Sequence, residues 1–330
     1  MQDGYGRTID YMRISITDRC NLRCRYCMPE QIETVDMSEL LTYEEIATVV
    51  SEAAGIGITR IKITGGEPLV RLKAARLIEM LKVIPGIEEV TLTTNGILLS
   101  EQLGDLIQAG VAGINISLDT LDPERYHQLT GFDSLDQVKE GVEAALDSGV
   151  PVKINAVSLE REDVEPLIEL TKDRPLDVRF IELMPIGMGK GFTGLSHDEI
   201  LTWLREKYGS GQNPESGLQR DETRHGNGPA VYYRIPGYRG SIGLISAIHG
   251  KFCDSCNRIR MTSQGFLKSC LCYDTGVDVR EVLRSPFSEE ERNSGVRNCL
   301  EKCILSKPDA HSFLHREQIS EQKNMSAIGG

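Results

Sequence analysis

Short apolar and β-branched runs alternate with amphipathic stretches through the first two-thirds of the chain. Such runs are typical of buried strands, and apolar residues at every third or fourth position are typical of helices. The expected strands are Met12–Ile16, Ile58–Ile63, Val90–Thr94, Gly113–Leu118, Val152–Val157 and Val178–Leu183. The expected helices are Thr42–Ala54, Leu72–Leu81, Ser100–Ala109, Ser134–Ser148 and Asp163–Thr171. The alternation predicts an α/β fold of parallel βαβ units, either a doubly wound sheet or a barrel.

The pattern changes at residues 209–229, where glycines and prolines interrupt a polar stretch. We therefore expect an α/β unit at residues 1–208, a loop or boundary at 209–229, and a C-terminal region at 230–330. In that last region, Val231–Ile235 and Ile242–Ile245 are expected to be short strands. The end of the chain is expected to be helical and charged, with breaks at Pro286 and Pro308.

Composition narrows the class of protein. The 330 residues carry a formal net charge of −12, with 40% hydrophobic and 26% charged residues, which is ordinary globular composition. An acidic chain lacks the basic face that nucleic-acid phosphates require. No apolar run approaches the roughly 20 residues of a membrane span, and the first five residues lack the features of a secretion signal. We expect a soluble, cytoplasmic protein with neither a nucleic-acid nor a membrane partner.

Cysteine carries the clearest chemical signal. The chain has nine cysteines, an odd number that argues against a disulfide scaffold, and most of them are clustered. Cys20, Cys24 and Cys27 form a CxxxCxxC segment directly after the first expected strand, and Tyr26 precedes the last cysteine. Three thiolates on one loop leave a coordination position of a metal centre open, which is typical of catalytic sites. A zinc site completed by a distant ligand is the alternative.

A second group of thiols comprises Cys253, Cys256 and Cys270. Here Cys272 offers a fourth thiol, so a zinc ribbon is a serious alternative to an open three-thiolate site. Cys299 and Cys303 are spaced i, i+4 on an expected helix, and we interpret them as small buried residues.

Polar motifs follow successive expected strands. Gly65-Gly66-Glu67-Pro68 follows the second, Thr93-Thr94-Asn95-Gly96 ends the third, and Ser117-Leu118-Asp119 ends the fourth. Each motif alone is weak evidence for a functional site. Together they place polar side chains at the carboxyl ends of parallel strands, where barrel active sites assemble, so the barrel is favoured over the doubly wound sheet.

The CxxxCxxC segment, with Tyr26 and the Gly-Gly-Glu-Pro turn, resembles the radical S-adenosylmethionine superfamily. The resemblance implies an incomplete (βα)6 TIM-type barrel and a [4Fe–4S] cluster held by Cys20, Cys24 and Cys27. It also implies that S-adenosylmethionine binds the open iron and yields a 5′-deoxyadenosyl radical. The positions that match S-adenosylmethionine contacts are Tyr26, Gly66, Ser117 and Met184.

Motifs at both ends of the chain resemble one family within that superfamily, the GTP 3′,8-cyclases of molybdenum cofactor biosynthesis. They are Gly6-Arg7, the Arg13–Cys20 segment, the Cys253–Arg260 segment with Cys270-Leu271, and the final Gly329-Gly330. Cys272 departs from the family pattern. The resemblance implies that the C-terminal extension holds a second [4Fe–4S] cluster on Cys253, Cys256 and Cys270, facing the guanine base, and that the tail Gly329-Gly330 reaches the active site.

Further residues are implied to bind GTP, and they are Arg13, Lys62, Thr93, Lys153, Arg258, Ile259 and Arg260. Basic side chains on inward-facing strand positions fit this role, because a buried phosphate needs Arg or Lys to pair with it. Lys62 and Arg60 share one strand face. We expect Arg60 to point outward, and either a bulge or a deeper position to bring Lys62 to the site.

The implied activity is conversion of GTP to (8S)-3′,8-cyclo-7,8-dihydroguanosine 5′-triphosphate. The implied partners are an external electron donor of the flavodoxin or ferredoxin type, a downstream cyclic pyranopterin monophosphate synthase, and a second copy of the chain in a homodimer. Two alternatives remain at this point. One is another twin-cluster radical enzyme, such as a peptide maturase, and the other is a zinc-binding nucleic-acid module.

Overall fold

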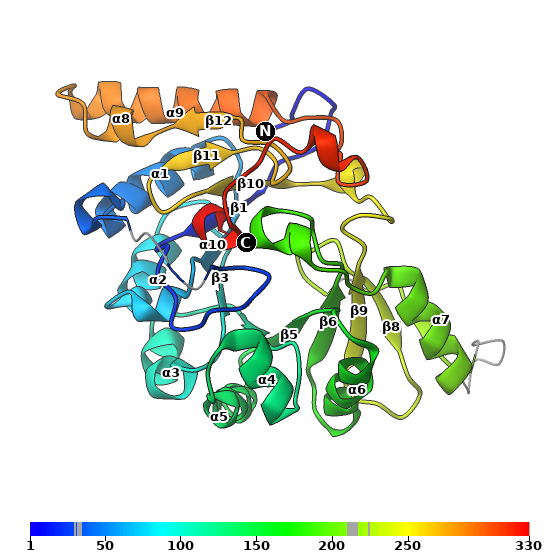
Figure 1. Cartoon of the computed structure of the whole chain (residues 1–330). Helices are drawn as coiled ribbons and strands as arrows, with labels where there is room; N and C mark the ends of the chain where they lie inside the picture. Colours follow the sequence, from blue (N-terminus) through cyan, green and yellow to red (C-terminus); the bar gives the residue numbers. More distant parts are fainter. Residues whose placement is uncertain (30, 32–34, 210–216, 224, 330) are drawn as a thin grey trace.

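The structure is a computed structural model that describes residues 1–29, 31, 35–209, 217–223 and 225–329 (Figure 1). Its first part contains β1 (Tyr11–Ser15), α1 (Tyr43–Gly55), β2 (Arg60–Thr64), α2 (Ala74–Lys82), β3 (Glu89–Thr94), α3 (Leu99–Gln108), β4 (Ile114–Ser117), α4 (Pro123–Thr130), α5 (Leu135–Asp147), β5 (Val152–Val157), α6 (Val164–Asp173), β6 (Asp177–Ile181) and α7 (His197–Tyr208). The C-terminal part contains β7 (Gln219–Asp221), β8 (Val231–Arg234), β9 (Ser241–Ile245), β10 (Arg258–Met261), β11 (Phe266–Lys268), β12 (Gly276–Asp278), α8 (Arg280–Leu283), α9 (Glu289–Leu305) and α10 (Met325–Ile328).

One sheet runs through the molecule in the order β12-β11-β10-β1-β2-β3-β4-β5-β6-β9-β8-β7. The strands from β1 to β6 are parallel neighbours in chain order. A doubly wound sheet would reverse its strand order at a switch point, so the predicted incomplete barrel is confirmed. The C-terminal part extends this barrel at both edges, because β10 pairs with β1 and β9 pairs with β6, both in parallel.

The polar face of the barrel strands lines the interior, and the apolar face packs under the helices. On β2, Ile61 and Ile63 are fully buried in the main apolar core, whereas Arg60, Lys62 and Thr64 alternate with them on the opposite face. Some of the helices begin at side-chain caps. Thr42 and Glu45 form a capping box on α1, and Ser288 and Glu291 form one on α9.

Two helices, α4 and α7, were not anticipated from the sequence. α4 buries only Tyr126 and Thr130 among its eight residues, so its apolar periodicity is too weak to stand out. α4 is important for the site, because the loop of the first cysteine triad is hydrogen-bonded to its last turn.

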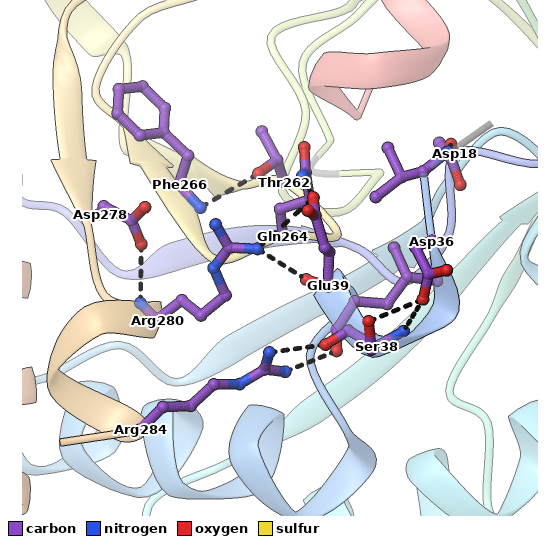
Figure 2. Close-up of polar contacts among 12 residues, drawn as sticks. Asp18, Asp36, Ser38, Glu39, Thr262, Gln264, Phe266, Asp278, Arg280 and Arg284 are labelled. Atoms are coloured by element: carbon purple, nitrogen blue, oxygen red, sulfur yellow. Dashed lines mark hydrogen bonds and ion pairs between the residues drawn. The ribbon is translucent and has the colours of Figure 1, made fainter. Parts of the chain in front are cut away.

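The C-terminal part also binds residues 38–40, in the segment that follows the first cysteine triad in the chain. Figure 2 shows Arg280 and Arg284 reaching across to this segment. Arg280 Nη1 donates to the carbonyl of Glu39 at 3.1 Å, and Arg284 donates to the carbonyls of Ser38 and Leu40 at 2.6 and 2.8 Å. Guanidinium groups that bind several carbonyls at fixed spacing hold the backbone in one conformation.

No helix in the described ranges combines the length and apolarity needed to cross a bilayer.

Candidate active site

The first cysteine triad lies on a loop that follows β1 and is docked on the end of α4. The backbone N–H groups of Arg23 and Arg25 donate to the carbonyls of Thr130 and Leu129 at 2.9 and 3.0 Å. These are last-turn carbonyls that a helix leaves without intrahelical partners. The Cys27 N–H turns back to the Cys24 carbonyl at 2.8 Å, which closes the loop.

The three thiols of this loop are free and lie close enough to influence one another electrostatically. Burial raises the pKa of Cys20 to about 11 and that of Cys27 to about 12, and it raises the pKa of Cys24 well above its usual range. A buried thiolate therefore needs positive charge beside it, which a bound iron centre supplies. The donor set fits a cluster with three protein ligands.

Within the described part of the chain, no three His, Cys, Asp or Glu side chains gather around a point where one metal ion could sit. An iron–sulfur cube does not require its cysteines to meet at one point, since each cysteine binds a separate iron. The triads fit this arrangement.

Gly65-Gly66 passes directly beneath the triad loop. The Gly66 N–H donates to the Thr17 carbonyl at 2.7 Å, and a Cβ on Gly66 would lie 2.4 Å from the Arg19 carbonyl oxygen. The next residue, Glu67, is buried and accepts from the Thr94 hydroxyl and from the backbone N–H of Asn95 at 2.7 and 2.6 Å. Burial raises the pKa of Glu67 to about 7. This side chain thus ties the carboxyl ends of β2 and β3 together.

Tyr26 is held in place by a carboxylate at the end of β4. Its hydroxyl donates to Asp119 Oδ2 at 2.6 Å, and Asp119 Oδ1 accepts from the Val157 N–H at 2.8 Å. Burial raises the pKa of Asp119 to about 6, against the effect of the Tyr26 hydrogen bond. Ser117 is exposed at the end of β4, and Met184 is half-buried in the loop after β6. The positions expected to contact S-adenosylmethionine therefore follow the carboxyl ends of β1, β2, β4 and β6.

Three cations lie side by side on neighbouring strands inside the barrel. In the sheet register, Arg13 on β1 is opposite Arg260 on β10 and opposite Lys62 on β2. Lys62 and Arg260 are buried, with 8% and 7% of their surface exposed. In the described structure, neither makes an ion pair with a carboxylate. Burial and the neighbouring cations lower the pKa of Arg13, and lower those of Lys62 and Arg260 well below their usual ranges. Such a layer is stabilised by a bound anion.

Other predicted positions surround this layer. Arg258 lies one layer nearer the amino ends of the strands, above the Tyr11 ring. Lys153 is held by Asp177 at 3.1 Å and by the His225 carbonyl, so a carboxylate already balances its charge. Thr93 is half-buried on β3 and accepts from Asn115 at 3.5 Å. Ile259 points the opposite way, into the apolar core, so only its backbone faces the layer.

The expectation that Arg60 points outward is wrong. The β1–β2–β3 register is continuous, with no bulge, so Arg60 and Lys62 share the interior face. Arg60 lies at the start of the strand and pairs with Asp10 and Glu88 at 2.5 and 3.4 Å. Lys62 lies deeper, beyond the reach of these carboxylates.

Arg179 was not among the residues predicted from the sequence. This residue is buried on β6, and its Nε donates to Asn155 Oδ1 at 2.8 Å. It lies close enough to Lys62 to lower the pKa of that lysine. The sequence of this strand contains a signal for it, because a charged residue, Arg179, lies between two apolar residues, Val178 and Phe180, that are both buried.

The second cysteine triad lies at the other end of the same strands. Cys256 precedes β10, whose first residue is opposite the first residue of β1, whereas Cys20 follows the last residue of β1. The two triads are therefore separated along the strand direction by the length of β1, which is roughly 16 Å for five residues. Although burial opposes ionisation, Lys307 and Arg258 lower the pKa of Cys256, and burial raises the pKa values of Cys253 and Cys270. Arg7 supports this loop by donating to the Cys253 carbonyl at 3.0 Å.

Cys272 is fully buried in a small apolar cluster beside this triad, and its sulfur accepts from the Ser312 N–H at 3.3 Å. At the end of the chain, the Gly329 carbonyl accepts from Arg260 Nη1 at 2.8 Å. A Cβ on Gly329 would lie 3.1 Å from the Ser15 Cβ. Gly330 lies outside the described residues. The tail thus reaches the cationic layer at Gly329, between the two triads.

We predict that Gly66→Ala prevents metal loading of the first triad, because the added Cβ meets the Arg19 backbone at 2.4 Å. Iron content after anaerobic reconstitution should fall by about half, with the second triad still loaded. Gly104→Ala is the matched control, since its Cβ meets open space on α3. Equal iron content in both variants would contradict the prediction.

We predict that Asp119→Asn flattens the pH dependence of stability of the metal-free protein. The folded-state pKa of Asp119 is raised from 3.8 to about 6, so its contribution is present below pH 3.8 and is lost as the pH rises through 6. A shift of about two pKa units corresponds to about 3 kcal/mol. The variant should gain stability relative to the parent between pH 4.5 and about 7.5, as measured by urea unfolding. A constant difference would refute this.

Comparisons with known proteins agree with this geometry. Residues 14–173 match the model of the radical SAM superfamily, and residues 176–313 match the model named Molybdenum Cofactor Synthesis C. The GTP 3′,8-cyclase of Clostridium perfringens strain 13 is 44% identical to the chain, and that of Petrotoga mobilis is 43% identical. Each alignment covers 100% of both proteins.

Solved structures show the same fold. Streptococcus suis SuiB bound to S-adenosylmethionine has a TM-score of 0.61 at 14% identity, covering 96% of this chain and 76% of that one. The structure titled native anSMEcpe with bound AdoMet has a TM-score of 0.56 at 13% identity, covering 93% and 94%. At such identities the likeness establishes the radical SAM fold alone, whereas the full-length relatives establish the family. The chain belongs to the GTP 3′,8-cyclase family, the radical S-adenosylmethionine enzymes of molybdenum cofactor synthesis.

Proposed function

We propose that this chain converts GTP to (8S)-3′,8-cyclo-7,8-dihydroguanosine 5′-triphosphate, with S-adenosylmethionine and two [4Fe–4S] clusters as cofactors. The observation that carries the proposal is the layer of cations between two cysteine triads, formed by the half-buried Arg13 and the buried Lys62 and Arg260. A triphosphate would supply negative charge beside Lys62 and Arg260, which make no ion pair with a carboxylate in the described structure. The guanine base then extends toward the second triad and the ribose toward the first.

The first triad would hold the cluster that reduces S-adenosylmethionine. When bound, that cluster would supply the electron that cleaves S-adenosylmethionine to methionine and a 5′-deoxyadenosyl radical able to take the hydrogen atom from the ribose C3′. Once C3′ is bonded to guanine C8, the cyclised radical needs one more electron, from the external donor, and one proton to become the product. The protein's own part is positioning and exclusion of water. We propose that Tyr26, Gly66, Ser117 and Met184 orient S-adenosylmethionine, and that the Asp119 hydrogen bond keeps Tyr26 in place.

The cations orient the substrate. Arginine forks bind phosphate oxygens with two parallel hydrogen bonds, and lysine acts as a point charge. We propose that Arg13, Lys62 and Arg260 bind the triphosphate together with Arg179, while Arg258 and the Ile259 backbone face the base and ribose. Thr93 and Lys153 line the same interior. Cys253, Cys256 and Cys270 would hold the second cluster, where Lys307 and Arg258 favour the Cys256 thiolate.

The reaction also needs partners that family membership supports. An external one-electron donor of the flavodoxin or ferredoxin type reduces the first cluster, and a downstream cyclic pyranopterin monophosphate synthase consumes the product. A cytoplasmic location, a homodimeric state and the division of the chain at residues 209–229 stay predictions.

The direct test is anaerobic. After reconstitution, iron and sulfide are counted, and S-adenosylmethionine, GTP and dithionite are added. We expect about eight irons per chain and GTP-dependent formation of 5′-deoxyadenosine together with a cyclised GTP product. Four irons with zinc, or cleavage of S-adenosylmethionine with GTP unchanged, would overturn the assignment.

A Lys62→Met substitution should separate stability from activity. Removing a buried cation from a cluster of like charges should stabilise the ligand-free protein by about 2 kcal/mol. Losing its phosphate contact should lower kcat/KM for GTP by about a hundredfold.

Thermal unfolding and steady-state kinetics measure both effects, and Lys302→Met, on the exposed side of α9, is the control. A Lys62→Met variant that is less stable and fully active would refute the role of the layer.

A further inference from the structure

Residues 307–329 form a strap that leads from the second cysteine triad to the first, drawn in orange-red to red in Figure 1. At its start, Lys307 donates to the carbonyls of Arg258 and Ser269 at 2.9 and 2.7 Å, and the His311 N–H donates to Cys253 Sγ at 3.5 Å. At its end, the strap reaches the first triad and the cationic layer. A single segment therefore contacts a thiol of each triad.

The far end of the strap has a defined position. The Ser326 backbone N–H lies against the Cys27 thiol. Three residues later, the Gly329 carbonyl accepts from Arg260, and Gly329 packs on Ser15 at the carboxyl end of β1. Ser326 belongs to α10, which has only four residues, and so short a helix has no stability of its own. Its position depends on what anchors the strap.

Part of the anchor is a small apolar core. Phe313, Ile319 and Ile328 of the strap pack with Leu271 and Ile186. This core is separate from the main core of the barrel. It is small, so it leaves the strap dependent on a second interaction.

That second interaction is a buried ion pair between Lys268 and Glu321. Both side chains are only 2% exposed. Lys268 Nζ also donates to the Tyr273 carbonyl at 2.6 Å, and Glu321 Oε1 accepts from the Lys323 N–H at 2.7 Å. The Glu321 N–H donates to the Cys272 carbonyl at 3.2 Å. Both charges are thus paired and hydrogen-bonded, which is the condition under which a buried pair is tolerated.

The pair connects two functional segments. Lys268 ends β11, two residues before Cys270 of the second triad, and Glu321 lies five residues before Ser326. Neither residue touches the proposed S-adenosylmethionine or GTP positions. Removing one partner would leave the other as an uncompensated buried charge, which the strap relieves by leaving its place.

We propose that Glu321 is a positioning residue of the active site: its ion pair with Lys268 holds the strap so that Gly329 reaches Arg260 and Ser326 reaches Cys27. This inference rests on the proposed function. With the strap released, Arg260 loses its carbonyl partner and water enters beside the first triad. Radical formation then becomes uncoupled from cyclisation, because a closed site is what protects a reactive intermediate.

The test uses the reconstituted holoenzyme with Glu321→Gln, and with Glu317→Gln as the matched control on the exposed side of the strap. Glu321→Gln should raise the ratio of 5′-deoxyadenosine to cyclised product at least about tenfold. It should also raise the rate of tryptic cleavage after the exposed Lys323 by a similar factor. The EPR signal of the reduced first cluster should change, since its Cys27 loses a hydrogen-bond donor.

The double variant Lys268→Met/Glu321→Met separates loss of the ion pair from loss of the Glu321 carboxylate. It also replaces the single variant in these measurements if Glu321→Gln fails to load clusters. It removes both charges and leaves an apolar contact, so the coupling ratio and protease resistance should return toward the parent values. Parent-like coupling and proteolysis in Glu321→Gln would overturn the proposal. A double variant that resists trypsin and stays uncoupled would also overturn it, because Glu321 would then act chemically.

The two proposals fail in different ways. If the parent protein forms no GTP-dependent 5′-deoxyadenosine, the proposed function fails. The proteolysis and EPR comparisons would still decide whether Glu321 holds the strap.

Discussion

The structure depends on a cluster of like charges buried inside an open barrel. Arg13, Lys62 and Arg260 lie opposite one another on three neighbouring strands, and burial of the charged forms of Lys62 and Arg260 is unfavourable. An ordinary barrel fills this space with apolar side chains. The apolar faces of the same strands meet the helices in a large continuous core, whose burial offsets the unfavourable desolvation of these charges. The outer face of the sheet thus supplies the stabilising apolar burial, and the inner face carries the residues proposed to bind GTP.

The two thiol triads flank this layer in different electrostatic environments. In the first, burial disfavours every thiolate, so metal binding and ionisation are strongly linked. In the second, Lys307 and Arg258 favour the Cys256 thiolate before any metal arrives. The loops themselves are held by backbone contacts, through α4 for the first triad and Arg7 for the second. Each triad therefore has its geometry set by residues other than its ligands.

The C-terminal part extends the barrel at both of its edges. β9 and β10 pair with β6 and β1, and Arg280 and Arg284 bind the carbonyls of Glu39 and Ser38, in the segment that follows the first triad in the chain (Figure 2). The strap then crosses from one triad to the other, secured by an apolar patch and the Lys268–Glu321 pair. These contacts make the two ends of the sequence parts of one site.

The sequence by itself determined the alternation of strands and helices, the two triads and the family, because these are local patterns and spacings. It could not determine that Arg60 and Lys62 share a face with different partners, since the pairing depends on Asp10 and Glu88 from other elements. Arg179 was missed because its role comes from neighbouring strands, and α4 because it buries little apolar surface. Only the tertiary structure decided which charges are paired. Desolvation depends on everything packed around a group, and chain order does not record that.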